Sequence, residues 1–415
     1  MFDTISLSIG AIVGAGIFVL TGLASQVAGP ALILSVLIAS FVATLTAISI
    51  SNLVRAFPKE GGEYEYGYKI LSPFAGFISG WMWTLNKMVA GGVLVLGFAT
   101  YLSAFFPFIP LKETAVTLIG LVTLINHRGV RTIGTAIDFL VILKLSILIF
   151  FIVLGSLFIK ADNFFPFAPQ GVGGVLHAAA IIFFAYVGFA RPVYLVEEIK
   201  NPRKNIPKGI FLGLSISTVI YLLVTIVAIG LVGSSSLART DSPLAIAIAS
   251  TNVNWAPNLI VLGGLIATFS VLLDDNLALS RMIFAIGRKG DYPKWFAKIE
   301  KKSRAPRRAI LATGMITAIL TFLFDLRQLA EVASFLILTY FALVNLSAIK
   351  MEKKKLPAII PVIGFIGTLS LALSLAVKNI IIGLLLISIG IVYFHLKRSA
   401  SGTVKRNVIH ITESG

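Results

Sequence analysis

Several charged residues lie inside long apolar stretches of this sequence, where a charge is costly and usually serves a function. Lys144 is the clearest example, because it lies near the middle of the stretch 133–158 and is too far from either end to reach water easily. Apolar surroundings disfavour the charged form of a lysine, so Lys144 could bind and release a proton. A static tether between two helices is the alternative role.

Four more charged residues lie in apolar stretches: Lys87, Arg191, Asp274 and Asp275. Lys87 either lines a path through the protein or pairs with an acid, and we keep both interpretations. We expect Arg191 and the two aspartates in the same half of the membrane, so a buried arginine–aspartate pair is one interpretation. Direct contact between Arg191 and an acidic ligand is the other.

Two apolar stretches are interrupted near their middle by residues that weaken helices. Residues 10–18 read Gly-Ala-Ile-Val-Gly-Ala-Gly-Ile-Phe, and residues 183–192 read Phe-Phe-Ala-Tyr-Val-Gly-Phe-Ala-Arg-Pro. The two stretches lie five spans apart and cross the membrane in opposite directions. Matched interruptions of this kind indicate the binding site of an inverted-repeat transporter. Close helix packing through Gly10 and Gly14 is the alternative.

The backbone groups freed at two such breaks suit a zwitterion. Amides near residues 14–16 start the second half of the first helix, and a helix start favours a carboxylate. Carbonyls after Phe184 end the first half of the other helix, and a helix end favours an ammonium group. An α-amino acid carries both groups a few ångströms apart, so the pair of breaks predicts an amino acid site.

The elements that must position these residues are membrane helices. Apolar residues make up 57% of the 415 residues and charged residues 13%, whereas soluble domains carry about 25% charged residues. The absence of cysteine excludes disulfides and thiolate metal sites. We therefore predict an all-α integral membrane protein with about twelve transmembrane helices. The expected spans are 2–27, 31–54, 73–106, 113–126, 133–158, 173–197, 207–232, 256–287, 308–324, 328–349, 357–377 and 379–396.

The basic residues are distributed unevenly among the expected loops. If the N-terminus is cytoplasmic, most of the 35 lysines and arginines fall in cytoplasmic loops and in the C-terminal tail. The net charge of +17 then reflects membrane orientation and not a nucleic-acid surface. An even number of spans places both termini in the cytoplasm.

Four groups of residues, in order along the chain, resemble motifs of the amino acid–polyamine–organocation superfamily of transporters. They are residues 14–18, residues 57–64 with 76–81, residues 183–189 with 197–207, and residues 280–293. The resemblance covers nearly the whole chain, and it is greatest to proton-coupled, sodium-independent prokaryotic amino acid permeases.

The resemblance implies a five-plus-five inverted repeat of the leucine-transporter type, with the first and sixth helices broken. The single transmembrane domain would span 1–396, with repeat one at 1–158, repeat two at 173–350 and two extra helices at 357–396. Residues 397–415 would form a short cytoplasmic tail.

The resemblance also implies roles for individual residues. Amides around Gly14, Ala15 and Gly16 would hold the substrate carboxylate. Carbonyls of Phe184, Ala185 and Val187 would hold its amino group. Lys144 would face the broken first helix near Gly10, where some members carry a lysine in place of a sodium ion. Glu197 and Glu198 would belong to an inner gate or anchor a loop, with a solvated acidic pair as the alternative.

These observations predict a proton-coupled amino acid permease of the plasma membrane that works by alternating access. A transporter of polyamines or other organic cations, or an amino acid exchanger, is the near alternative. A membrane enzyme would need a catalytic constellation at one membrane face and a channel would need pore loops, and the sequence has neither pattern. We expect no cofactor, no metal ion, no nucleic acid and no obligate protein partner.

Overall fold

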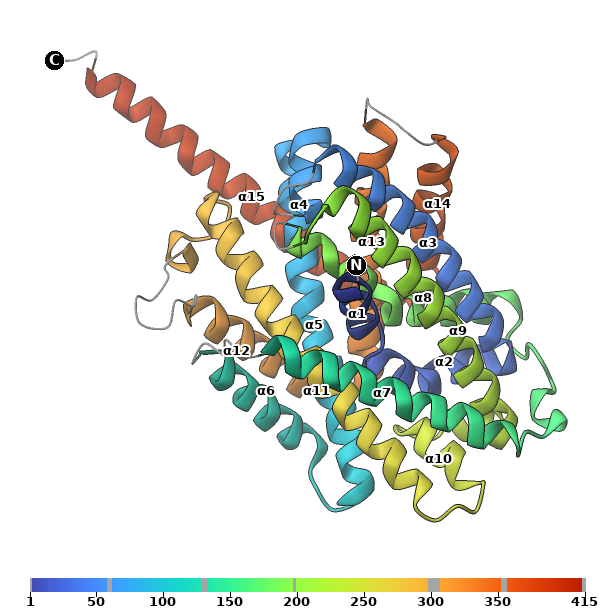
Figure 1. The fold of residues 1–415 in the computed structure, drawn as a ribbon. Helices are drawn as coiled ribbons and strands as arrows, with labels where there is room; N and C mark the ends of the chain where they lie inside the picture. The colour runs from blue at the N-terminus through green and yellow to red at the C-terminus, as the bar shows by residue number, and fades with distance from the viewer. Residues whose placement is uncertain are drawn as a thin grey trace.

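The computed structural model describes residues 2–57, 62–127, 133–196, 199–297, 307–351 and 357–412, and every regular element in these ranges is a helix (Figure 1). The first half of the chain contains α1 (Phe2–Ile12), η1 (Gly16–Leu20), α2 (Thr21–Ala28), η2 (Gly29–Ala31), α3 (Leu32–Ala56), α4 (Gly62–Tyr66), η3 (Gly67–Leu71), α5 (Pro73–Phe105), α6 (Leu111–His127) and α7 (Ile133–Ser156). The second half contains η4 (Ala161–Phe164), α8 (Gly171–Tyr186), η5 (Val187–Leu195), α9 (Pro202–Leu237), α10 (Pro243–Ala249), α11 (Ala256–Arg288), η6 (Lys294–Ala297), α12 (Arg307–Leu323), α13 (Leu326–Lys350), α14 (Ile359–Leu373) and α15 (Val377–Thr412).

The described residues contain 8 helical segments long and apolar enough to cross a membrane. The first of them, Thr4–Ala56, includes both the interrupted first helix and α3, and the shorter α14 is also apolar. These segments agree with the predicted multi-pass, all-α class. The number of twelve spans and the inverted repeat stay predictions.

Local sequence explains where several of these helices begin. Ser72 caps α5, because its hydroxyl accepts a hydrogen bond from the Ala75 amide at 3.1 Å, and Pro73 follows at the first helical position. Asp325 and Gln328 form a capping box at the start of α13. These caps satisfy amides that the helix itself leaves free.

The first helix lies in the middle of the bundle (Figure 1). It packs against α7, α9, α11 and η5, and its side chains from Ile12 to Leu20 are buried. Residues 12–20 are apolar on every side, and a helix of this kind can be buried on all sides. Their composition therefore fits their central position.

The first helix is interrupted where the sequence predicts it. The helix α1 ends at Ile12, Val13 and Gly14 lie outside any helix, and the chain resumes in the π-helical turn η1. Glycine weakens a helix, and π-helical turns occur often at functional sites.

The sixth span changes pitch where the sequence predicts a break. The helix α8 runs two residues past Phe184 to Tyr186, and the chain continues as the 3₁₀ helix η5, which contains Pro192. In an α-helix the proline ring would clash with the carbonyl of residue 188. The 3₁₀ helix η5, which has fewer residues per turn, therefore accommodates Pro192 without opening the chain.

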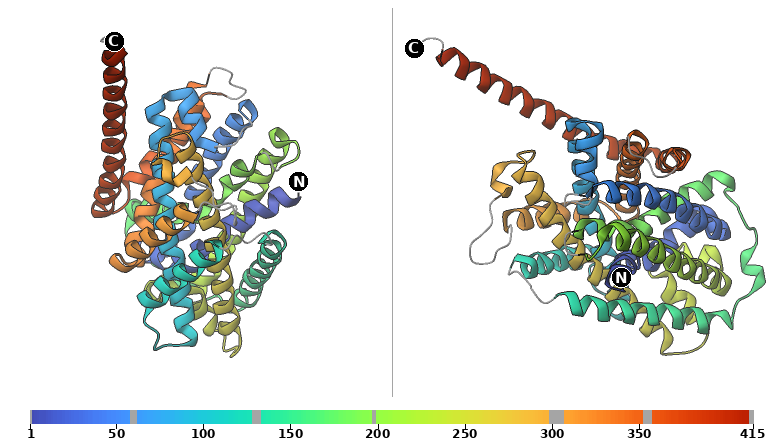
Figure 2. Two further views of the ribbon diagram at one scale, coloured as in Figure 1. Left: turned by 90° about the vertical axis from the view of Figure 1, so that its left-hand side faces the viewer. Right: turned by 45° about the horizontal axis from the view of Figure 1, so that its top comes forward.

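At one end of the bundle, α4 and η3 are fastened to the end of α11. The hydroxyl of Tyr64 donates to the Asp291 carboxylate at 2.5 Å, and the hydroxyl of Tyr68 donates to the same oxygen. Lys397 of α15 lies 3.7 Å from the other oxygen of Asp291. The helix α15 continues to Thr412 and extends beyond the bundle, so much of the expected tail is helical (Figure 2).

Candidate functional site

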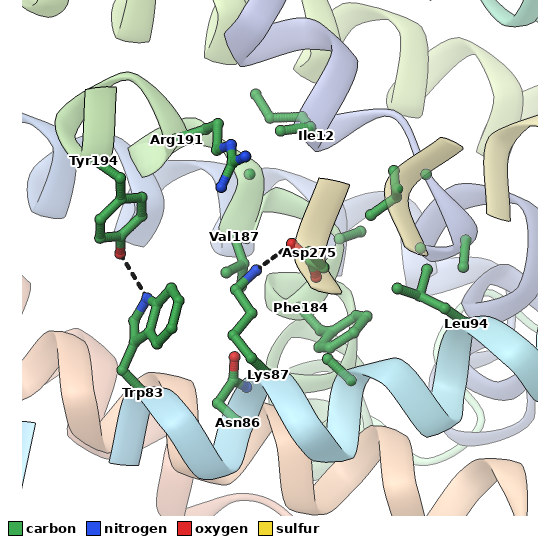
Figure 3. Close-up of a pocket in the computed structure, with 18 residues that line it drawn as sticks. Ile12, Trp83, Asn86, Lys87, Leu94, Phe184, Val187, Arg191, Tyr194 and Asp275 are labelled. Atoms are coloured by element: carbon green, nitrogen blue, oxygen red, sulfur yellow. Dashed lines mark hydrogen bonds and ion pairs between the residues drawn. The ribbon is translucent and has the colours of Figure 1, made fainter. Parts of the chain in front are cut away.

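A pocket lies between the two interrupted helices, and it is closed on its other sides by α5 and α11 (Figure 3). All six residues that the sequence predicts at a substrate site line it: Gly14, Ala15, Gly16, Phe184, Ala185 and Val187. The space within it that water-sized molecules can reach is about 50 Å³, which is room for a few waters. The structure therefore brings these six residues together, and their role in binding stays a prediction.

The two interrupted helices touch through their backbones. A Cβ atom added at Gly188 would lie 2.1 Å from the carbonyl carbon of Ala11, and one added at Gly16 would lie 2.2 Å from the Cβ of Ala185. Real side chains cannot approach so closely, so glycine is required at both crossings. The glycines thus let the first and sixth spans share one pocket wall.

The hydroxyl of Tyr221 on α9 contacts the backbone of both interrupted helices. It lies 2.7 Å from the carbonyl oxygen of Ile12 and 3.2 Å from that of Ala185, and the residue is completely buried. The Ala185 carbonyl, predicted to be free for an amino group, therefore has a protein partner already.

Lys87 enters the pocket from α5. Its ammonium group lies 2.7 Å from an oxygen of Asp275 on α11 and 5.9 Å from the ring centre of Trp83 (Figure 3). Both charged side chains are mostly buried and both residues line the pocket. The sequence left two interpretations of Lys87 open, and both describe the structure. The residue lines the pocket, and it pairs with an acid.

Arg191 lines the same pocket from η5. Its guanidinium group donates to the Asp274 carboxylate on α11, so the arginine–aspartate interpretation matches the structure. Its Nε atom is buried and has no hydrogen-bond partner in the described part of the chain. Contact with an acidic ligand stays open as a second role.

Lys144 lies just behind this pocket. Its side chain is completely buried, and its ammonium group donates to the carbonyl oxygen of Gly10 at 2.7 Å. The two residues line a second, smaller cavity that also contains Asp274. Ala11 and Val271 line both cavities, so the two cavities are neighbours.

Other predicted features lie elsewhere. Glu197 and Glu198 fall outside the described residues. Among the described residues, no group of three or more histidine and acidic side chains could hold a metal ion.

The sequence interpretation missed several polar contacts of the site. The indole of Trp83 donates to the hydroxyl of Tyr194 at 2.8 Å, which joins α5 to η5. The side-chain amide of Asn86 donates to the carbonyl of Ala333 on α13 at 2.8 Å. A lone tyrosine in the apolar helix α9 was the available signal for Tyr221, because a buried hydroxyl needs a partner.

A buried acid at the far end of α13 was also missed. Glu331 is completely buried. It accepts hydrogen bonds from Arg327 at 3.0 Å and from Asn379 at 2.8 Å, and lies 3.3 Å from His177. These contacts join α8, α13 and α15. Glu331 lies near a helix end, where an acid is expected to be solvated, so no pattern in the sequence singled it out.

Comparison with known proteins decides the class of the molecule. The family model described as amino acid permease matches residues 1–405. The chain belongs to the amino acid permease family. The superfamily resemblance expected from the motifs is thereby confirmed, and so is the prediction of a transporter and not an enzyme.

The relatives of this permease are named for the transport of different substrates. It is 31% identical to the branched-chain amino acid permease of Bacillus subtilis, over 95% of this chain and 91% of that protein. It is 32% identical to the methylthioribose transporter of Bacillus subtilis, over 85% and 80% of the two chains. It is 30% identical to the vacuolar cationic amino acid transporter 4 of Arabidopsis thaliana, over 80% and 59%. Membership in the permease family therefore indicates transport, and the names of these relatives do not agree on one substrate.

Proposed function

We propose that this permease is a proton-coupled amino acid symporter that works by alternating access in the plasma membrane. The observation that carries the proposal is the pocket between the two interrupted helices, because it gathers helix-end backbone and charged side chains in one place. Amides of residues 14–16 bind the substrate carboxylate. The carbonyls of Phe184 and Val187 accept hydrogen bonds from its amino group, and that of Ala185 is shared with Tyr221.

The charges of the pocket favour a ligand with a carboxylate over a polyamine. Lys87 and Arg191 bring two positive charges to the lining, while Asp275 brings one negative charge that Lys87 already pairs. A polycation would face like charges in a site with little water, where repulsion is weakly screened. Both cations already have a carboxylate partner, Asp275 and Asp274, so the carboxylate of an amino acid would bind to their remaining N–H donors.

Lys144 is the proposed carrier of the coupling proton. Its protonated form holds α7 to α1 through the Gly10 carbonyl, with no water-exposed surface on the lysine. Loss of the proton weakens this bridge and favours a different arrangement of the first helix. Proton movement and alternating access are thereby linked through one residue.

The proposed topology has twelve spans with both termini in the cytoplasm. Residues 1–158 and 173–350 form the two inverted repeats, and the antiparallel crossing of Ala11 with Gly188 lies near their pseudo-two-fold axis. The uneven distribution of basic residues supports this orientation.

Uptake into proteoliposomes tests the function. The substrates are labelled leucine, glutamate and arginine, together with putrescine and methylthioribose, each with and without an inward proton gradient in sodium-free buffer. We expect at least one amino acid to accumulate only when the gradient is imposed. Accumulation of putrescine or methylthioribose alone, or a requirement for sodium, would contradict the proposal.

A further inference from the structure

Helix α11 carries two consecutive carboxylates that serve two different cavities. Side chains of consecutive helix residues point about 100° apart. Asp275 faces the substrate pocket and pairs with Lys87, while Asp274 lines the smaller cavity with Lys144. The guanidinium of Arg191, which lines the substrate pocket, reaches Asp274. Asp274 therefore connects the substrate pocket to the lysine behind it.

The smaller cavity leaves Lys144 with one charged neighbour. Gly10 of α1 presents a carbonyl oxygen to the ammonium group, Ser270 presents a hydroxyl, and Asp274 presents the carboxylate. The described residues that line this cavity include no other titratable side chain. The cavity has room for about one water molecule, which could bridge Lys144 and Asp274.

Arg191 is placed to exchange partners. It is only 9% exposed, and its Nε donor has no partner among the described residues. A carboxylate that enters the pocket would be attracted to this guanidinium, because paired N–H donors bind carboxylates strongly. The carboxylate would then compete with Asp274 for Arg191.

We propose that Asp274 couples substrate binding to protonation of Lys144. When a substrate carboxylate reaches Arg191, either the α-carboxylate at the amides of residues 14–16 or a side-chain carboxylate, Asp274 gives up part of its partner, and its negative charge is left beside Lys144. The neutral amine of Lys144 then takes a proton from water that reaches the site, and the resulting ammonium ion pairs with Asp274. By linkage, the bound proton strengthens substrate binding to the same extent. This inference rests on the proposed function, because it takes Lys144 as the proton carrier.

Calorimetry of the purified permease tests the inference directly. Titration of substrate in buffers of different ionisation enthalpy gives the number of protons taken up per molecule bound. We expect the wild type to take up about one proton per molecule bound. Over the pH range in which this proton is taken up, the dissociation constant should rise about tenfold per pH unit. Leucine and glutamate distinguish an α-carboxylate from a side-chain carboxylate at Arg191, since only glutamate carries the second. Isopentylamine, which is leucine without its carboxylate, should bind without proton uptake.

Variants separate the inference from the proposed function. Asp274→Asn should bind substrate with proton uptake near zero, although Lys144 is intact. Asp275→Asn is the matched neighbour: we expect weaker binding that still takes up about one proton per molecule. The double variant Arg191→Gln, Asp274→Asn leaves no unpaired charge and should also take up none.

Three outcomes decide the matter. Proton uptake that persists in both Asp274 variants but is lost in Lys144→Ala overturns the role of Asp274 and leaves the proposed function standing. Isopentylamine that takes up as many protons as leucine, with both values well above zero, also overturns the partner exchange. Absence of uptake in the wild type, with every substrate of the panel, overturns the proposed proton coupling itself.

Discussion

The ammonium group of Lys144 on α7 donates to the carbonyl oxygen of Gly10 on α1, across 2.7 Å. Gly10 lies only three residues before the chain leaves the helix at Val13. One lysine is thus attached to the last turn of the segment whose interruption lines the pocket. A change of charge on Lys144 acts directly on that turn.

Replacing Lys144 should separate binding from accumulation. Lys144→Ala removes the proton carrier and the bridge to Gly10, so we expect loss of pH-driven accumulation in proteoliposomes while substrate still binds. Lys112→Ala is the control, because that exposed lysine donates to the carbonyl of Phe322 far from the pocket. A Lys144→Ala variant that accumulates substrate with the wild-type pH response would rule the mechanism out.

Arg191→Ala should destabilise the fold. Removal of one partner from a buried ion pair costs about 3–5 kcal/mol, because the other charge stays buried. Adding Asp274→Asn should restore part of the loss, whereas adding Asp275→Asn should not, since Asp275 pairs with Lys87. The midpoint of thermal unfolding in detergent measures all three. Strictly additive losses in both double variants would show that Arg191 and Asp274 act independently.

Gly16→Ala should abolish transport. The new methyl group would overlap the side chain of Ala185, 2.2 Å away, and would push the two interrupted spans apart. Gly120→Ala on α6 is the matched control, because no atom lies within 4 Å of its Cβ position. Uptake and surface expression are compared for both. Normal uptake by Gly16→Ala would mean that the close crossing is not needed.

Tyr221→Phe should weaken transport more than Tyr101→Phe. Both variants lose one buried hydrogen bond to a carbonyl, worth about 0.5–1.5 kcal/mol of stability. The hydroxyl of Tyr101 reaches the carbonyl of Phe18 at 2.6 Å, beyond the break at Val13 and Gly14, whereas that of Tyr221 reaches Ile12 and Ala185. Initial uptake rates and unfolding midpoints distinguish the two positions. Equal uptake rates would assign Tyr221 a purely structural role.

High pH should loosen the attachment of α4 and η3 to α11. Burial, together with the hydrogen bond to Asp291, raises the pKa of Tyr64, and the same causes raise the pKa of Tyr68. An unfolded tyrosine loses its proton near pH 10. Stability from these bonds is therefore complete below about pH 10 and falls as the pH rises further. The unfolding midpoint of the wild type should drop more steeply above pH 10 than that of Tyr64→Phe, Tyr68→Phe. Parallel curves would contradict this.

The sequence was most informative where lipid makes a residue type costly. A charge in an apolar stretch must find a partner, which singled out Lys144, Arg191 and Asp274 before their contacts were known. Glycines in a membrane helix likewise located the first interruption. The second was placed two residues early, because Pro192 is accommodated by a change of helical pitch and not by an open break.

Contacts that depend on packing between distant segments were beyond the sequence. Nothing local indicates that Tyr221 meets Ile12, or that Trp83 meets Tyr194. The partner of Lys87 stayed open for the same reason: either of two adjacent acids could face it, and only the rotation of α11 about its axis assigns Asp275.

The hydroxyl of Tyr221 has a single hydrogen and two carbonyl oxygens within reach. It can point that hydrogen at Ile12 or at Ala185, so at any moment only one of the two oxygens accepts from this phenol. Rotation about one C–O bond thus shifts the hydrogen bond from the first span to the sixth while both backbones stay still. A ligand N–H group that donated to one of these oxygens would compete with the phenol for it and would favour the phenol's bond to the other helix.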